Sequence, residues 1–570
     1  MTRSRLGPLA CDVLGKRYLR RNELGRVVET PEEMFARVAK HVSLAEIRFG
    51  KDRAKMTSAF GTIMKEGLFF PNSPTLMNAG LKDGQLSACF VVPVDDSIAG
   101  ISDALKEMAI IHQSGGGTGF SFSKLRPRGD PVRSTGGVAS GPVSFMEIFN
   151  KATEVVKQGG RRRGANMAVL KADHPDIEEF VHAKEVAGRL ENFNISVGAT
   201  DQFMHKATLG QDLELVNPRT GDVSDSLDAR HLLREIATTA WKRGDPGMLF
   251  LDTINRSHPV PGVIEATNPC GEQPLLSHES CNLGSINLSR FVAKGEIEWD
   301  QLGDIVSLAV RFLDDVIEMN SFPFSAIEDA TLKTRKIGLG VMGFAEMLIE
   351  MEISYNSTDA LDIAEKVMSF ISSEAREESR KLGVARGSFP LMETSSLEHR
   401  YDAMRNATVT TISPTGTISI LAGTSPGIEP LFAVSFSRDL LGEKAVVVTS
   451  PHFEKMAKKW GVYSPKLMKT VAEKGTLQDV KVPTGLKEIF VTAMEVSPKQ
   501  HVRMQAAFQK YTDNAVSKTV NLSNEAKVKD VVETFELAHK LGCKGTTVYR
   551  YGCRDQVLYL GETAGRCERC

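Results

Sequence analysis

Short runs of β-forming residues alternate with long amphipathic helices along most of the chain, and this alternation restricts the fold more than any other feature. The β-rich runs cover 86–94, 194–197, 248–251, 409–412 and 546–549. Helical patterns lie between them, with apolar residues at three- and four-residue spacing in 305–316 and in 361–375. Strands separated by helices of this length predict an α/β fold with a largely parallel sheet.

The first seventy residues carry a different signal. Thr30-Pro31-Glu32-Glu33 combines an N-cap, a proline at the first helical position and a capping-box glutamate, and predicts a helix through Val42. We therefore expect a small helical region over 1–70 and the α/β body over 71–552. Residues 553–570 show neither helical nor strand periodicity and are expected to form a flexible tail.

The charge balance excludes several classes of protein. The chain has 570 residues, with 70 Lys and Arg against 71 Asp and Glu, so no whole-molecule field is available to hold a nucleic acid or a membrane surface. No apolar run is long enough for a signal-peptide core or a membrane span, which predicts a cytoplasmic protein. Eight cysteines are too few for a disulfide scaffold and are expected to be thiols. Cys11 is expected to be a small buried residue.

Residues 338–343 match the G-x-G-x-x-G pattern of dinucleotide-binding folds. That pattern requires a preceding buried strand, and Lys333, Thr334, Arg335 and Lys336 make a poor one. We therefore expect these glycines to serve close helix packing. An NAD-dependent oxidoreductase remains the weaker alternative.

Three cysteines lie in segments that suggest chemistry. Asn268-Pro269-Cys270-Gly271-Glu272 places a cysteine between an amide and a carboxylate on a tight loop, where three side chains can converge on one ligand. Cys281 follows eleven residues later, and Cys89 lies in a β-rich run. Taken alone, a loop cysteine is more often inert than catalytic.

Seven segments, three of them containing these cysteines, follow one another in a fixed order. They cover 73–75, 86–92, 114–120, 158–166, 268–272, 279–288 and 412–419. Together they resemble the catalytic subunit of ribonucleotide reductases, and the resemblance extends from near residue 30 to near residue 555. It implies a ten-stranded α/β barrel of the ribonucleotide reductase and glycyl-radical type, with the Cys270 loop as a central finger.

The resemblance also implies roles for the motif residues. Cys270 would carry a thiyl radical that abstracts the 3′-hydrogen of the ribose, and Glu272 would accept the 3′-hydroxyl proton. Asn268 would orient the substrate. Cys89 and Cys281 would supply two reducing equivalents and become a disulfide as the 2′-hydroxyl leaves as water. A nucleotide-binding regulator with a lapsed active site is disfavoured because every catalytic position is filled.

Substrate phosphates are expected at the turn that follows the β-rich run 409–412. Backbone N–H groups and the positive end of a helix dipole would face an anion there, although taken alone the segment is better read as an ordinary strand-to-helix turn. The resemblance implies that Thr415, Gly416, Thr417 and Ile418 bind the phosphates. By resemblance, the same pocket is lined by Ser73, Ala88, Gly117, Pro269 and Gly271. The choice between a diphosphate and a triphosphate is left open.

The resemblance predicts an allosteric specificity region at about 90–170. Arg161, Arg162 and Arg163 resemble a loop that connects an effector site to the active site, and the flanking glycines and the neutral total charge argue against a nucleic-acid patch. Asp96, Ser97 and Arg126 resemble effector-binding residues, with dNTP or ATP as the effectors.

The origin of the radical distinguishes the classes of this family. A relay through adjacent tyrosines is interrupted here, because Arg550 separates Tyr549 from Tyr551, and no glycyl-radical motif is present. We therefore expect adenosylcobalamin as the radical source, with no residue assigned to a metal site. The catalytic subunit of a two-subunit (class I) reductase is the alternative.

The chain ends in Cys567-Glu568-Arg569-Cys570. In the family such a pair exchanges electrons with the active-site disulfide, so we expect a redox-active tail and a thioredoxin-like reductant. Half of a zinc site shared with Cys543 and Cys553 is the alternative. A homodimer is the family norm.

Overall fold

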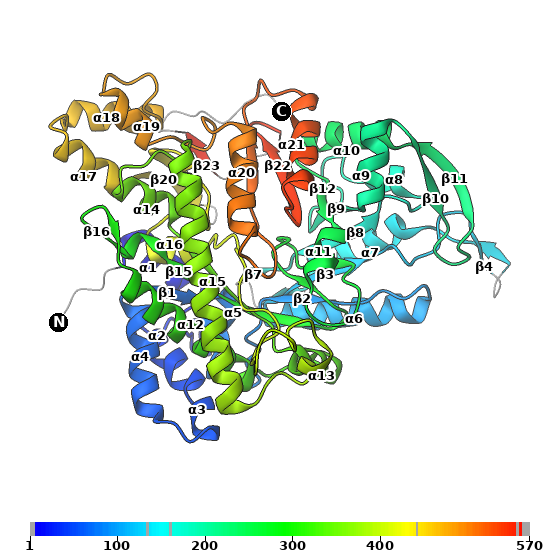
Figure 1. Cartoon of the computed structure of the whole chain (residues 1–570), viewed down its shortest axis with the longest axis horizontal. Coiled ribbons are helices and arrows are strands. Elements are labelled where there is room, and N and C mark those ends of the chain that lie inside the picture. The colour runs from blue at the N-terminus through cyan, green and yellow to red at the C-terminus, as the bar shows by residue number, and fades with distance from the viewer. Residues whose placement is uncertain (1–5, 133–135, 159–161, 441–442, 554–557, 561–570) are drawn as a thin grey trace.

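Two sets of five parallel strands form the centre of the molecule in the computed structural model, which describes residues 6–132, 136–158, 162–440, 443–553 and 558–560 (Figure 1). The first set has the spatial order β2 (Cys89–Val91), β3 (Gly117–Ser121), β8 (Asn166–Lys171), β9 (Phe193–Ala199) and β12 (Gly247–Phe250). Each strand pairs with its neighbour in parallel.

The second set closes the barrel. It consists of β15 (Ser280–Asn287), β18 (Ile337–Met342), the segment 410–412, β21 (Thr519–Leu522) and β22 (Gly545–Arg550). The segment 410–412 joins through single parallel bridges, from Thr410 to Leu339 and from Ile412 to Val516. The two sets meet in antiparallel pairs, β15 with β2 and β12 with β22. The expected ten-stranded α/β barrel is confirmed.

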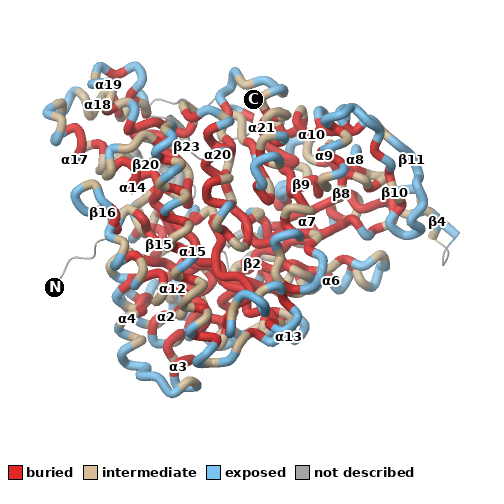
Figure 2. The backbone as a smooth tube through the Cα atoms, viewed as in Figure 1, coloured by how far each residue is buried: buried red, intermediate tan, exposed pale blue. Residues whose placement is uncertain are grey.

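Helices connect the parallel strands and cover the outside of the barrel, as such crossovers require. Around the first set lie α6 (Ile98–Ser114), α7 (Pro142–Val155), α8 (Ile177–His182), α9 (Asp201–Leu209) and α10 (Ala229–Arg243). Helix α11 (Leu251–Ser257) follows β12 and contacts β9 of the same set. Around the second set lie α12 (Trp299–Met319), α13 (Ser325–Thr334), α14 (Phe344–Glu350), α15 (Thr358–Arg386), α16 (Ile418–Ala422), α20 (Pro498–Gln509) and α21 (Val528–Lys540). Burial is concentrated in the strands and on the inner helix faces (Figure 2).

A helical region precedes the barrel. It contains α1 (Pro8–Arg17), α2 (Pro31–Val42), α3 (Ala45–Arg48), α4 (Arg53–Lys65) and, after β1 (Phe69–Pro71), α5 (Ser73–Asn78). The predicted helix start is confirmed, because the Thr30 side chain accepts from the Glu33 N–H and the Glu33 carboxylate accepts from the Thr30 N–H. Strand β1 pairs antiparallel with β15 and so attaches this region to the barrel.

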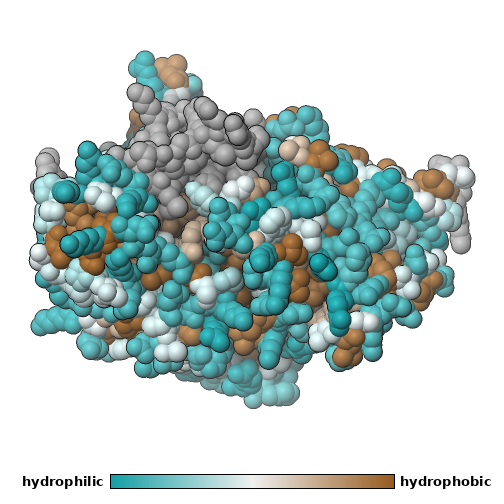
Figure 3. Space-filling model, turned by 90° about the horizontal axis from the view of Figure 1, so that it is seen from above, coloured by the Kyte–Doolittle hydropathy of each residue, from teal (hydrophilic) through white to brown (hydrophobic). Residues whose placement is uncertain are grey.

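Smaller elements lie around the barrel. Short hairpins are formed by β4 (Pro131–Val132) with β5 (Gly137–Val138), β6 (Lys157–Gln158) with β7 (Arg162–Arg163), β10 (Asp212–Val216) with β11 (Val223–Asp228), and β16 (Val292–Ala293) with β17 (Glu296–Ile297). Strands β19 (Ser435–Leu440) and β20 (Glu443–Thr449) precede α17 (Pro451–Lys459), α18 (Pro465–Lys474) and α19 (Thr484–Ile489). No helix among the described residues is long and apolar enough to cross a membrane. On the face in Figure 3, hydrophobic residues are scattered among hydrophilic ones.

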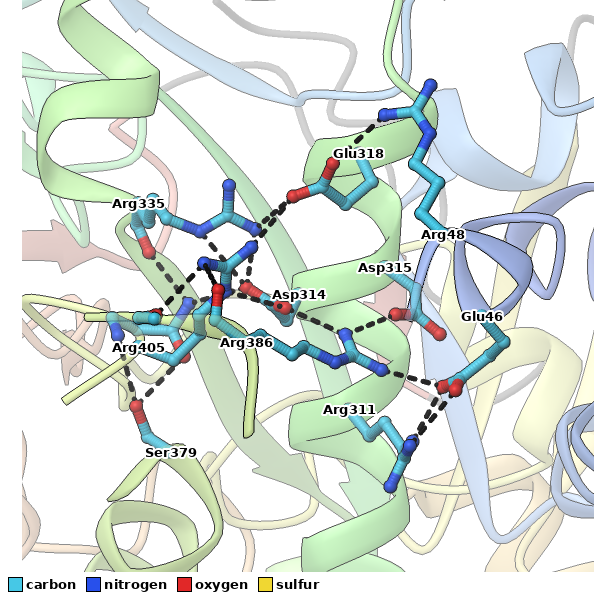
Figure 4. Close-up of polar contacts among 12 residues, drawn as sticks. Glu46, Arg48, Arg311, Asp314, Asp315, Glu318, Arg335, Ser379, Arg386 and Arg405 are labelled. Atoms are coloured by element: carbon cyan, nitrogen blue, oxygen red, sulfur yellow. Dashed lines mark hydrogen bonds and ion pairs between the residues drawn. The ribbon is translucent and has the colours of Figure 1, made fainter. Parts of the chain in front are cut away.

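A buried ionic network joins the N-terminal helices to the barrel (Figure 4). Asp314 on α12 accepts hydrogen bonds from Arg335, Arg386 and Arg405. Arg386 also donates to Glu46 on α3, whose carboxylate binds Arg311 in turn. Glu46 and Asp314 have no exposed surface, so the charges depend on one another rather than on water.

Several sequence expectations are wrong in detail. Residues 338–343 do not serve helix packing: they follow two buried cations and form most of β18, a fully buried strand. Arg335 and Lys336 are buried because Asp314 and Glu279 neutralise them. Gly340 is needed because a Cβ there would lie 2.1 Å from the Thr411 carbonyl oxygen.

Three more expectations need correction. The run 86–94 contains only the three-residue strand β2, and the run 409–412 contributes single bridges instead of a regular strand. Part of the expected tail has regular structure, since β23 (Leu558–Leu560) pairs with β19. Cys567 and Cys570 lie outside the described residues. Cys11 is exposed, not buried.

Candidate active site

The Cys270 loop is the tip of a hairpin that enters the barrel. Its arms are β13 (Ala266–Thr267) and β14 (Pro274–Leu275), which pair antiparallel. The tip is closed by hydrogen bonds from the Asn268 N–H to the Gln273 carbonyl (3.1 Å) and from the Gln273 N–H to the Asn268 side-chain oxygen (3.0 Å). Gly271 has a φ of 82°, a left-handed conformation that glycine adopts without strain.

Both halves of the barrel hold this finger. From the first half, Asn194 on β9 donates to the Pro269 carbonyl at 2.7 Å. From the second half, the Ala515 N–H and the Thr411 hydroxyl each donate to the Glu272 carbonyl at 2.9 Å. The tip is therefore fixed in position before any ligand binds.

Glycines on β3 explain how the finger fits inside the barrel. A Cβ at Gly119 would lie 1.7 Å from the Thr267 carbonyl oxygen, and one at Gly117 would lie 2.9 Å from the Pro269 ring. Any side chain at these positions would displace the finger. Gly117 and Gly119 are thus required by the close approach of the finger to β3.

Cys89 and Cys281 lie directly opposite each other on β2 and β15. Opposed residues of an antiparallel pair have Cα atoms about 4.5–5.5 Å apart, which lies inside the range of about 4.4–6.8 Å found for disulfides. Both cysteines are buried, and Asn268 donates from its side-chain nitrogen to the Cys89 sulfur at 3.0 Å. The register therefore permits a disulfide beside the finger.

The surroundings of Cys281 keep its thiol protonated. Burial raises the pKa of Cys281 above its ordinary value, and the positive charge of Lys336 offsets this only in part. The thiol donates to the backbone carbonyls of Asn282 (3.4 Å) and Lys336 (3.5 Å). Lys336 itself pairs with Glu279 at 2.5 Å. Cys281 is thus a neutral hydrogen donor in the resting protein, not a thiolate.

A cavity of about 320 Å³ lies beside the finger and collects most of the predicted site residues. Its lining includes the predicted residues Ser73, Ala88, Cys89, Gly117, Asn268, Pro269, Cys270, Glu272, Thr415, Gly416, Thr417 and Ile418. Cys270 is exposed to this space, whereas Asn268 and Glu272 are each only 2% exposed. Two predicted residues are absent from the lining: Cys281 lies behind Cys89, and Gly271 faces a second cavity.

The predicted phosphate turn has a different basis from the expected helix dipole. Helix α16 has only five residues, so its dipole is small. The turn is instead shaped by Thr415, which has a φ of 47° and accepts the Gly427 N–H at 2.7 Å. Any anion held there depends on the N–H groups of the turn and on charges from elsewhere.

A second cavity of about 460 Å³ reaches Cys270 from the side of β9, β12, β21 and β22. Its lining combines apolar groups with Asn521, Thr546 and Tyr549. The Thr546 hydroxyl is buried and has no hydrogen-bond partner among the described residues. This space fits a nucleoside-sized group of a larger cofactor placed next to the Cys270 sulfur, not a whole corrin ring.

The predicted effector residues form a separate cluster at the start of α6. Arg126 binds Asp96 through its side chain at 2.8 Å, and Ser97 caps α6 by accepting the Gly100 N–H. Arg162 and Arg163 form β7, paired with β6, and Arg161 lies outside the described residues.

Several lining residues were not anticipated from the sequence. Arg17 and Tyr18 enter the first cavity from the N-terminal region, and Asn72, Met77, Leu283, Gly284, Ser285 and Ser413 complete it. Arg17 and Tyr18 carry no local motif. Asn72 directly precedes a recognised segment, Met77 lies two residues after one, and the other four lie within such segments, so this proximity was the available signal.

Comparison with known proteins gives matches over nearly the whole chain. The family described as "Ribonucleotide reductase, all-alpha domain" matches residues 4–84. The family described as "Ribonucleotide reductase, barrel domain" matches residues 87–403 and 397–549.

Curated relatives and a solved structure agree with these matches. A vitamin B12-dependent ribonucleoside-diphosphate reductase of Thermoplasma acidophilum is 49% identical, over 97% of this chain and 80% of that protein. One from Mycobacterium tuberculosis is 47% identical, over 97% and 81%. The class Id ribonucleotide reductase alpha subunit of Actinobacillus ureae shares the fold, with a TM-score of 0.79, 23% identity and coverage of 96% and 97%.

Proposed function

The chain belongs to the ribonucleotide reductase family, and on this premise we propose that it reduces ribonucleotides to 2′-deoxyribonucleotides through a thiyl radical on Cys270. The observation that carries the proposal is the position of the Cys270 tip. It lies in the same cavity as Glu272 and Asn268, beside the opposed pair of Cys89 and Cys281.

Each step of the reaction has a residue to perform it. Cys270 takes the hydrogen atom from C3′ of the ribose while Glu272 accepts the 3′-hydroxyl proton. The 2′-hydroxyl is protonated by a thiol of the Cys89–Cys281 pair and leaves as water. The pair supplies two electrons and two protons in all, one proton leaving in the water and one hydrogen being added to C2′, and it becomes a disulfide. Cys270 then returns the hydrogen atom to C3′ and is again a radical.

We propose adenosylcobalamin as the cofactor, because the B12-dependent relatives match at nearly half identity and the second cavity offers space next to Cys270. When bound, this cofactor supplies a carbon-centred radical by homolysis of its cobalt–carbon bond. The adenosyl group of the cofactor would be held by three residues of the second cavity, Asn521, Thr546 and Tyr549. Cys270 is exposed in the structure, so substrate and cofactor in the two cavities beside it would have to exclude water from its radical.

A reduction assay with adenosylcobalamin as the only added radical source tests the cofactor. We expect deoxyribonucleotide to form with it and none to form without it. No product with the cofactor, but product after a metal-loaded partner subunit is added, would replace the proposal by the two-subunit alternative.

Substrate form, effectors and assembly complete the proposal. Two of the relatives are ribonucleoside-diphosphate reductases, which favours a ribonucleoside diphosphate as substrate. The cluster of Asp96, Ser97 and Arg126 is proposed to bind a dNTP or ATP effector. A homodimer is supported by exposed apolar residues on α6 and α7, namely Ile98, Ile148 and Val155.

We also propose that Cys567 and Cys570 pass electrons from a thioredoxin-like protein to the Cys89–Cys281 disulfide. Replacing both tail cysteines by serine is expected to abolish repeated turnover with thioredoxin and to leave a single turnover of the pre-reduced enzyme unchanged. Rapid-quench measurement of product per site separates the two. Loss of the single turnover would show that the tail acts in the chemistry itself.

A further inference from the structure

The C-terminal end of α1 supplies a cation to the cavity. Arg17 is the last residue of α1 and lines the space beside Cys270, and Tyr18 follows it. Among the described residues that line this cavity, Arg17 is the one with a permanent positive charge. Helix α1 packs against α16, so Arg17 enters on the side of the Thr415–Thr417 turn.

The Arg17 side chain differs from those of Arg20, Arg21 and Arg37 in having no polar partner among the described residues. Arg20 donates to the Gly80 carbonyl, Arg21 to the Gly15 and Gly25 carbonyls, and Arg37 pairs with Glu29. Within the described part of the chain, the side chain of Arg17 makes no hydrogen bond and no ion pair. A guanidinium that is half-buried at a cavity wall and unpaired is available for a ligand, and its fork of donors matches a phosphate.

The next residue holds this arginine in place. Tyr18 is only 2% exposed, and its hydroxyl shares a hydrogen bond of 2.8 Å with the Ser73 hydroxyl on α5. Because Tyr18 is anchored in the cavity wall, the backbone of Arg17 cannot move away from the cavity. Helix α16 is short and has only a small dipole. A phosphate at the Thr415–Thr417 turn therefore needs a positive charge such as that of Arg17.

We propose that Arg17 binds the terminal phosphate of the ribonucleotide and so selects diphosphates over monophosphates. This inference rests on the proposed function and adds a specificity residue to it. Arg17 is a binding residue, and the Tyr18–Ser73 contact is a positioning contact.

Binding of cytidine diphosphate and cytidine monophosphate to the full chain tests the inference. Arg17→Ala is expected to raise the Kd of the diphosphate about tenfold to a hundredfold, the range for loss of a charge-assisted hydrogen bond. The Kd of the monophosphate is expected to change less than about twofold. Arg17→Lys, which keeps the charge but not the fork, is expected to fall between Arg17→Ala and the unchanged protein.

Arg26 is exposed, and its side chain makes no hydrogen bond or ion pair with the residues that the structure describes, so Arg26→Ala provides the matched control. It should bind both nucleotides as the unchanged protein does. If Arg17→Ala weakens both nucleotides equally, or weakens neither, Arg17 does not recognise the terminal phosphate. If Arg17→Ala does not fold, the same comparison with Arg17→Lys decides the question.

Failure of this inference is distinguishable from failure of the proposed function. The proposed function fails if the unchanged protein, supplied with adenosylcobalamin and a dithiol, forms no deoxyribonucleotide. The role of Arg17 is decided by the difference in Kd between the two nucleotides, which is measured without turnover.

Discussion

Cys270→Ser is expected to abolish ribonucleotide reduction, lowering kcat on the order of 10⁴-fold or more, while the protein stays folded. The serine hydroxyl has nearly the size of the thiol but cannot hold the radical. Cys270 is exposed at the finger tip, and the finger is held through the side chain of Asn268 and the backbone of Pro269 and Glu272. The substitution therefore removes the reactive atom and keeps these three contacts.

The control for this variant is another exposed cysteine. Cys11→Ser on α1 should keep kcat within about twofold, since surface substitutions away from special features change stability by less than about 0.5 kcal/mol. Product is measured by chromatography of the deoxyribonucleotide, and folding by circular dichroism. Substantial reduction by a folded Cys270→Ser protein would remove Cys270 from the role proposed for it.

The sequence predicted the catalytic residues of the site better than the other residues that line its cavity. Cys270, Glu272 and Asn268 lie within five residues of one another, so any fold that makes this segment a tight loop brings them together. The facing of Cys89 and Cys281 depends on pairing between β2 and β15, which are almost two hundred residues apart. The family resemblance supplied that pairing, because local periodicity carries no information on which strands are neighbours.

The errors have a common physical cause. Arg335 and Lys336 are charged, which argued against a strand at 337–342, yet their partners Asp314 and Glu279 come from distant segments. Burial of a cation is acceptable once a partner is present, and sequence patterns do not show partners. Arg17 was missed for the reverse reason: it lies on an ordinary helix, and only the packing of α1 against α16 brings it to the cavity.

Asp314→Asn is expected to lower the free energy of unfolding by about 3–5 kcal/mol at pH 7, because it leaves buried arginines without their counter-charge. Asp314 is completely buried and contacts Arg335, Arg386 and Arg405 (Figure 4). Burial alone would raise its pKa, but the three arginines outweigh burial and hold the pKa at about 2. Asp314 is thus ionised in the folded protein, and an amide cannot replace it.

The neighbouring Asp315 provides a matched comparison on the same helix. Burial raises its pKa well above the ordinary value; the charge of Arg386 opposes this and the charges of Glu46 and Asp314 add to it, so folding favours the protonated form more than the unfolded chain does. Asn has the shape and charge of a protonated Asp and still accepts from Arg386. Asp315→Asn is therefore expected to change stability by less than about 1 kcal/mol at pH 7, or to increase it slightly.

The two variants also differ in their dependence on pH. The folded pKa of Asp314 lies below its ordinary value of 3.8, so its stabilisation is complete above about pH 4 and disappears as the pH falls toward 2. The deficit of Asp314→Asn should shrink over that interval. For Asp315 the sign is opposite, since ionisation of the unfolded chain above about pH 4 favours unfolding, and the substitution removes that effect. Urea unfolding of both variants at pH 7 and near pH 3 measures these differences, and equal destabilisation at pH 7 would show that Asp315 is ionised as well.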